Sequence, residues 1–202
     1  MRRVLRPAIA GLVVVAVAVA VIVWLPLDAN VEADVKEALV GFETAREVAW
    51  PASEPIHLPL SDVRRASLAH DLRSGLARYA TGDALAEFDA RGAVLAFASS
   101  AAENRPWVVT KWAGEVVWFD FVRQTLRGAV IVRAGVRRAH QVGRMDADRQ
   151  RIVALRWGRD NGADIYEYTL RDTGDAWKVV TVKHWGVCGP NGEDVVEGRE
   201  SF

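Results

Sequence analysis

The chain has 202 residues, and its 26 Lys and Arg residues balance its 26 Asp and Glu residues at a formal net charge of +0. We therefore expect no nucleic-acid binding, which depends on an excess of positive charge to neutralise phosphates. Half of the residues (50%) are hydrophobic, a proportion typical of folded rather than disordered chains. One cysteine, Cys188, excludes an internal disulfide and a cysteine-based zinc site within this sequence.

Residues 8–27 form an uncharged run of 20 residues that is rich in valine. A helix of this length spans about 30 Å, the thickness of a bilayer's hydrocarbon core, so we expect a single transmembrane anchor. Basic residues precede the run and acidic residues follow it, which places residues 1–7 in the cytoplasm and the rest outside an inner cell membrane (Arg2, Arg3 and Arg6; Asp28, Glu32 and Asp34). A cleaved signal peptide ending near Val31–Ala33 is the alternative, although signal hydrophobic regions typically have only about 7 to 15 residues.

Residues 28–60 are predicted to form a juxtamembrane helix followed by a linker. Asn30 is a suitable N-cap, and apolar residues then recur at helical spacing (Val31, Val35, Leu39 and Phe42). Charged residues, Glu43 among them, are assigned to the opposite, solvent-facing side. The segment Trp50–Leu60 carries three prolines and indicates an extended linker. We place the boundary of the main domain there.

Two more helices are predicted before the hydrophobic pattern changes. Ser61 is expected to cap a helix whose apolar stripe ends at Thr81–Gly82 (Leu68, Leu72, Leu76 and Tyr79), with Gly82 in the left-handed region. Asp83 is expected to cap a third helix that runs through Leu85 and Phe88 to Leu95.

After Pro106 the hydrophobic pattern has a period of two, and five strands are predicted (108–124, 129–142, 151–158, 165–171 and 177–187). Turn residues at Asp160–Gly162 and Asp172–Asp175 predict hairpins, and so an antiparallel meander. Helices followed by hairpins indicate an α+β domain over residues 61–188. Residues 189–202 are expected to form a flexible acidic tail.

The segment Tyr79–Phe88 resembles the helix–Gly-Asp–helix corner of the nuclear transport factor two-like superfamily, which includes SnoaL-like proteins. In that superfamily two or three helices precede a curved antiparallel sheet that folds over them into a cone, and the predicted elements between Ser61 and Val187 are similar in order. With an anchor in front, the layout is also similar to bitopic subunits of type IV secretion or conjugation systems and to Mce-associated membrane proteins. This fold serves enzymes, binding modules and scaffolds alike.

The resemblance implies an Asp and a His inside the cone, for which the candidates are Asp120, His140 and His184. Asp120 shares a strand face with Trp118 and Val122, where apolar surroundings would favour the protonated carboxyl that acid–base catalysis uses. The simpler interpretation is an outward-facing aspartate and histidines in solvent or in the core. The histidines are isolated from one another in the sequence, so we expect no metal site and no cofactor.

Aromatic residues on the predicted sheet are candidates for a ligand cavity or a partner surface, with ordinary core packing as the alternative (Trp112, Trp118, Tyr166, Tyr168, Trp177 and Trp185). Cys188 lies after the last strand, where it forms either an intermolecular disulfide or an unpaired thiol.

Without a recognisable catalytic motif, we expect a non-catalytic, membrane-tethered scaffold that binds envelope proteins or a second copy of itself. The alternative is a small-molecule-binding protein, or an acid–base isomerase or dehydratase that uses Asp120 in the cone. Two observations distinguish these hypotheses: whether the cone holds an open cavity, and whether Asp120 points into it.

Overall fold

The computed structural model describes residues 28–50, 59–103, 107–146, 151–160 and 162–188. The predicted anchor, residues 8–27, and the predicted tail, residues 189–202, lie outside this part of the chain. Among the described residues, no helix has both the length and the hydrophobicity needed to cross a membrane.

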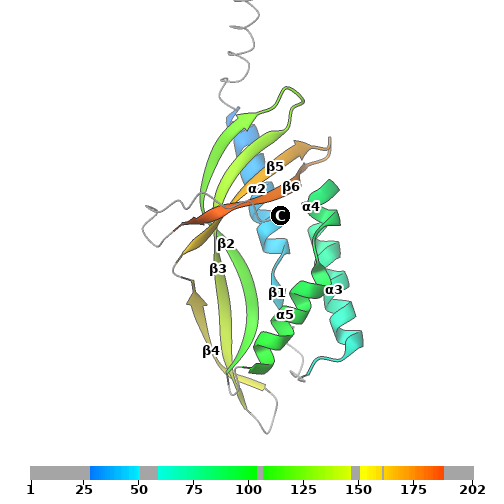
Figure 1. Cartoon of the computed structure of the whole chain (residues 1–202), viewed down its shortest axis with the longest axis vertical. Helices are drawn as coiled ribbons and strands as arrows, with labels where there is room; N and C mark the ends of the chain where they lie inside the picture. The colour runs from blue at the N-terminus through cyan, green and yellow to red at the C-terminus, as the bar shows by residue number, and fades with distance from the viewer. Residues whose placement is uncertain (1–27, 51–58, 104–106, 147–150, 161, 189–202) are drawn as a thin grey trace, which may run out of the picture.

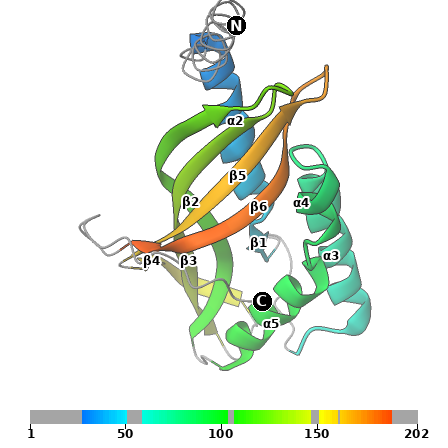
Figure 2. The same ribbon diagram turned by 45° about the horizontal axis from the view of Figure 1, so that its top comes forward.

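The described chain is an α+β domain with one antiparallel sheet, as expected, but the sheet has six strands rather than the predicted five because a short strand at Val48–Ala49 also joins it. The helices are α2 (Ala29–Ala45), α3 (Asp62–Leu76), α4 (Gly82–Ala86) and α5 (Ala90–Glu103). The strands are β1 (Val48–Ala49), β2 (Trp107–Gln124), β3 (Val130–Asp146), β4 (Arg151–Arg159), β5 (Ala163–Asp172) and β6 (Trp177–Cys188). Figures 1 and 2 show the curved sheet around α2, with α3, α4 and α5 beside it.

The helix ends follow local capping chemistry, with two corrections to the predicted caps. The cap of α2 is Asp28 rather than Asn30, because the Asp28 carboxylate accepts a hydrogen bond of 2.8 Å from the Asn30 amide. Ser61 caps α3 as predicted. Asp83 is not a cap, because it lies inside α4, whose N-cap is Thr81. The single helix expected after it is two helices, since α4 ends at Ala86 and the Asp89 carboxylate accepts from the Gly92 amide at the start of α5.

The longest strands, β2 and β3, pair along most of their length and give the sheet its curvature. Their register shifts three times, between Val109 and Lys111, Val116 and Trp118, and Phe121 and Arg123. Each such irregularity bends the strand that carries it, so the sheet closes over the helices.

The predicted meander is wrong at Asp160–Gly162. Strands β4 and β5 do not pair with each other; both pair with β3, at Ala139–Asp146 and Val130–Val136 respectively. The chain therefore bends here without reversing, and β4 and β5 follow the same side of β3 one after the other. The hairpin predicted at Asp172–Asp175 is present, with Gly174 at φ 91° in the turn between β5 and β6.

Helix α2 belongs to the core of the domain, which corrects the boundary predicted between residues 50 and 60. Its apolar residues Val35, Leu39 and Phe42 are 0%, 0% and 2% exposed and pack in one cluster with Val132 and Tyr168 of the sheet. The chain then continues from α2 into β1, which pairs with Lys111 and Trp112 of β2. Residues 28–50 are thus structurally inseparable from the helices and strands that follow.

A second, smaller cluster lies at the other end of the sheet. It joins β1, α3, α5 and β2 through buried side chains (Val48, Ala69, Leu72, Ala90, Val94, Phe97 and Val109). The two clusters leave a space between the end of α2 and the inner face of the sheet, and the candidate site occupies this space.

Candidate functional site

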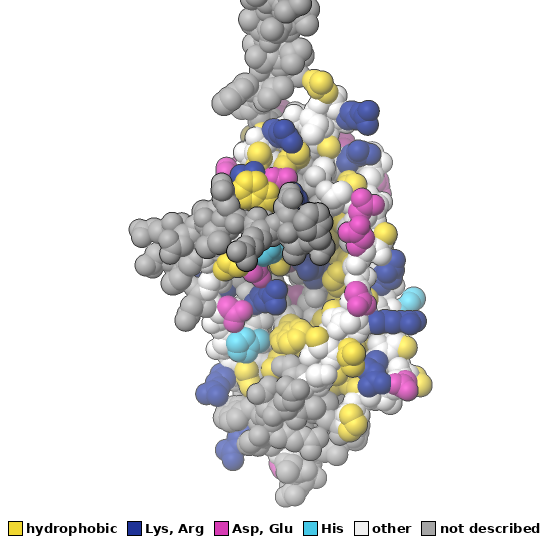
Figure 3. Space-filling model, viewed as in Figure 1, with side chains coloured by type: hydrophobic (Ala, Val, Ile, Leu, Met, Phe, Trp, Pro, Cys, Tyr) yellow, Lys and Arg dark blue, Asp and Glu magenta, His cyan; other side chains and the backbone are white. Residues whose placement is uncertain are grey.

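A cavity of about 460 Å³ opens between the two clusters on the concave side of the sheet. One part of its wall is apolar (Val48, Phe88, Ala93, Trp112 and Val136), and the other carries charged and hydroxyl groups (Glu43, Arg46, Arg138, His140, Asp160, Asp164 and Tyr166). In Figure 3, hydrophobic side chains are visible between the sheet and the helices, with basic, acidic and histidine side chains beside them. The concave side of the sheet is therefore open at this level.

The inner end of the cavity rests on a buried polar group of three side chains. Glu43 is 3% exposed; its carboxylate accepts a hydrogen bond of 2.9 Å from the Tyr168 hydroxyl and bonds of 2.9 and 3.2 Å from Arg46. Burial opposes the charge on Arg46, but the charge and hydrogen bonds of Glu43 outweigh it and raise the pKa of the guanidinium. Burial, reinforced by Glu43, also raises the pKa of Tyr168, which stays a neutral donor.

Gly114 of β2 leaves space for the Glu43 carboxylate. A Cβ at this position would lie 2.8 Å from Oε2 of Glu43 and 3.1 Å from Cγ1 of Val136. A side chain at position 114 would therefore displace the carboxylate or occupy the cavity.

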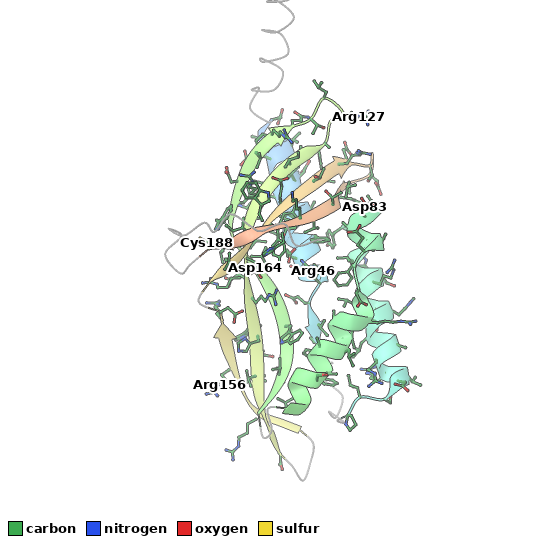
Figure 4. All side chains as sticks on the ribbon, in the orientation of Figure 1. Arg46, Asp83, Arg127, Arg156, Asp164 and Cys188 are labelled. Atoms are coloured by element: carbon green, nitrogen blue, oxygen red, sulfur yellow. The ribbon has the colours of Figure 1, made fainter. Side chains whose placement is uncertain are left out.

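A second polar cluster lies at the rim and centres on Asp164 of β5. Arg138 approaches one carboxylate oxygen at 3.2 Å, the Tyr166 hydroxyl donates to the same oxygen over 3.5 Å, and Nε2 of His184 lies 3.6 Å from the other. Burial and the charge of Asp164 raise the pKa of Tyr166. Figure 4 shows Asp164 at the beginning of β5 and Arg46 at the end of α2, two elements that both border the cavity.

His140, a predicted site residue, lines the cavity from β3. Its imidazole lies against Gly158 of the neighbouring strand β4, where a Cβ would overlap Nε2 and both ring carbons next to it. The glycine thus determines where the ring lies.

Asp120, a predicted site residue, lies outside the cavity. Asp120 is exposed and pairs in register with Arg133, whereas its neighbours Phe119 and Phe121 pack towards the core. Side chains alternate across a strand, so Asp120 lies on the convex face, outside the cavity in which the resemblance implied an acidic residue. His184 is near the site but half exposed (52%), with Asp164 rather than Asp120 as its carboxylate partner.

The aromatic candidates divide between the two faces of the sheet. Trp112 and Tyr166 line the cavity, Tyr168 is buried beneath it, and Trp177 packs against the main core. Trp118 and Trp185 lie on the convex face.

Each of these two tryptophans contacts a residue of β3. The Trp118 indole covers Gly135, and the Arg133 guanidinium stacks on the Trp185 ring at 3.5 Å from its centroid. Cys188 is a free thiol and only 6% exposed, so it is poorly placed for an intermolecular disulfide.

The sequence interpretation missed Glu43, Arg46 and Asp164, although signals for two of them were present. Glu43 continues the spacing of Val35 and Leu39 at i+4, which places it on the buried stripe of α2. Asp164 precedes Tyr166 by two residues and so shares its strand face. Within the described residues, no group of three or more His, Cys, Asp or Glu side chains is arranged to hold a metal ion.

Comparison with known proteins adds little to this picture. No family model and no curated protein matches the chain. Among solved structures, the intermembrane space region of the chloroplast protein ARC6 aligns with 79% of this chain and 98% of its own, at 9% identity and a TM-score of 0.38. A similarity at this level does not identify a function.

Proposed function

We propose that this domain binds a small organic molecule in the cavity between α2 and the concave face of the sheet. The observation that carries the proposal is the cavity itself, whose volume of about 460 Å³ lies in the range of small-molecule sites. A domain that served only as a scaffold would have no need to keep this space free of side chains, because filling it would add packing energy.

The two walls define the kind of ligand. Trp112 and Phe88 offer aromatic surface to an apolar body, and Trp112 is held edge-on against Phe97 at 5.6 Å. Arg138, His140 and Tyr166 offer hydrogen-bonding groups to a polar end. The ligand is therefore an amphipathic molecule with a ring-sized apolar part.

Ligand-detected NMR with three naphthalene probes of different charge tests this proposal: naphthalene-2-carboxylate, 2-naphthol and 2-naphthylmethylammonium. We expect at least one probe to bind. Ala93→Leu extends a side chain from α5 into the cavity and should weaken binding at least tenfold, whereas Ala96→Leu, on the exposed side of the same helix, should change it less than twofold. Binding that is equal in both variants, or absent for all three probes, would exclude the cavity as a site.

Acid–base catalysis is a second candidate function, favoured by the pairing of His184 with Asp164 at 3.6 Å beside the Tyr166 hydroxyl. A carboxylate in this position can orient an imidazole for proton transfer. Once a bound molecule is known, His184→Gln should abolish its turnover and leave its affinity within a few fold. If the protein only binds this molecule, the unchanged protein will not convert it to a product.

The expected location, a cell membrane with the domain outside, stays a prediction that depends on residues 1–34 of the sequence. The expected protein partners likewise stay a prediction. Both are compatible with a ligand-binding domain held at the membrane surface.

A further inference from the structure

Strand β4 leaves one of its edges without a partner strand. It pairs with β3 on one side, and no described strand pairs with it on the other. Leu155 and Trp157, alternate residues on one face of β4, are 58% and 54% exposed. An uncovered edge with large apolar side chains readily accepts another strand.

The end of β6 lies at the beginning of β5, a few residues past the end of β4. Cys188 pairs with Ala163, the first residue of β5, immediately after the bend at 160–162. Because β6 runs antiparallel to β5, a chain that leaves Cys188 and follows the same bend runs antiparallel to β4, along its free edge. The next residues, Gly189-Pro190-Asn191-Gly192, are of the types that form turns.

The chain beyond this turn is complementary to β4 in length and charge. Residues 193–202 are long enough to span the nine residues of β4. They carry four carboxylates against one arginine, with two valines between them (Glu193, Asp194, Glu197 and Glu200; Arg199; Val195 and Val196). Strand β4 carries three arginines and no acidic residue (Arg151, Arg156 and Arg159), of which Arg159 also lies 3.4 Å from the Glu115 carboxylate of β2. Figure 4 shows Arg156 at the outer side of the lower sheet, away from the helices.

We propose that residues 193–202 add a strand antiparallel to β4 of the same chain. The pairing supplies partners to the outward N–H and C=O groups of β4 and covers the edge beside Leu155 and Trp157. The link from Cys188 is only the four residues 189–192, so the effective concentration of the segment at β4 is high. This short link favours the same chain over a second copy as the occupant.

Hydrogen exchange of the full chain tests the proposal against a variant that ends at Cys188. In the full chain, the β4 amides that point away from β3 should be protected at every protein concentration. Removal of residues 189–202 should speed their exchange at least tenfold and leave the β3-bonded amides of β5 unchanged. If the shortened chain does not fold, Val196→Pro provides the test, because proline removes one N–H and disfavours strand pairing.

Charge reversal separates pairing at β4 from a general charge effect. Glu193→Lys with Glu197→Lys should speed exchange of the outward β4 amides several fold. Glu37→Lys with Asp71→Lys makes the same change in net charge at exposed positions on α2 and α3 and should have no such effect. Unchanged exchange in the shortened chain would overturn the proposal, as would protection that grows with protein concentration, which would assign the segment to a second copy.

Discussion

The Tyr168 hydroxyl donates a hydrogen bond of 2.9 Å to Oε1 of Glu43, joining the middle of β5 to the last turn of α2. The two residues are 125 positions apart in the chain. Glu43 and Tyr168 are 3% and 0% exposed, so this contact fixes α2 against the sheet from within the core. It also forms the support beneath the cavity, because Glu43 holds Arg46 at the cavity wall.

Removing either partner should destabilise the domain by different amounts. Tyr168→Phe deletes a hydrogen bond to a charged group and should cost about 1.5–3 kcal/mol. Glu43→Ala should cost more, because it also leaves the half-buried Arg46 guanidinium without its counter-charge. Urea unfolding of the two variants measures both values, and an equal cost for both would contradict a role for Glu43 beyond its bond to Tyr168.

Stability should fall at alkaline pH because of two tyrosines. In the folded chain, burial is the main reason why the pKa values of Tyr166 and Tyr168 are raised. Above about pH 10 tyrosines of the unfolded chain lose their protons while these two keep theirs, so rising pH favours unfolding. Each can contribute a slope of at most about 1.4 kcal/mol per pH unit there. Urea unfolding between pH 9 and 11 should show a shallower decline in the Tyr166→Phe, Tyr168→Phe double variant, and parallel declines would contradict this origin.

The sequence predicted the elements better than their partners, and Asp160–Gly162 illustrates why. Its residues are typical of a hairpin turn, yet the same residues also permit a bend that leaves both flanking strands on β3. The turn residues are compatible with both outcomes, and in the folded chain both strands pair with the long strand β3. Pairing between distant segments is not encoded in turn residues.

Helix α2 illustrates a similar limit for burial. Its apolar stripe was recognised from the spacing of Val35, Leu39 and Phe42, but a stripe does not say what it packs against. A proline-rich segment after it suggested a separate unit, whereas the helix fills the concave side of the sheet. The sequence does not show that Glu43 is buried, since a buried carboxylate requires partners, and its bond to Tyr168 forms only in the folded chain.

Residues 28–50 should therefore be required for folding. A chain that begins at Ser61 lacks α2 and β1 and would expose the apolar surface that Val35, Leu39 and Phe42 cover. We expect it to be unfolded or aggregated, and a chain that begins at Asp28 to unfold cooperatively. Circular dichroism with thermal unfolding compares the two, and a cooperative transition in the shorter chain would restore the boundary at residues 50–60.

The predicted anchor has its own test in cells. If residues 8–27 span the membrane with residues 1–7 in the cytoplasm, a reporter that is active only after export should be active when fused after Phe202. The full chain should fractionate with membranes and resist extraction by high salt. Recovery of a soluble mature chain that begins between Asn30 and Asp34 would support the signal-peptide alternative instead.

Two glycines that look alike in the sequence should respond oppositely to alanine. Gly75 lies inside α3 with no atom within 4 Å of an added Cβ, so Gly75→Ala should stabilise the domain by about 0.5–1 kcal/mol through its helix preference. At Gly158 a Cβ would overlap the His140 imidazole, and Gly158→Ala should push the ring from its place at the cavity wall. Urea unfolding should therefore show a gain for the first variant and none for the second. Binding of the naphthalene probes should weaken several fold only for Gly158→Ala, and a probe affinity that is equal in the two variants would show that His140 has no part in the site.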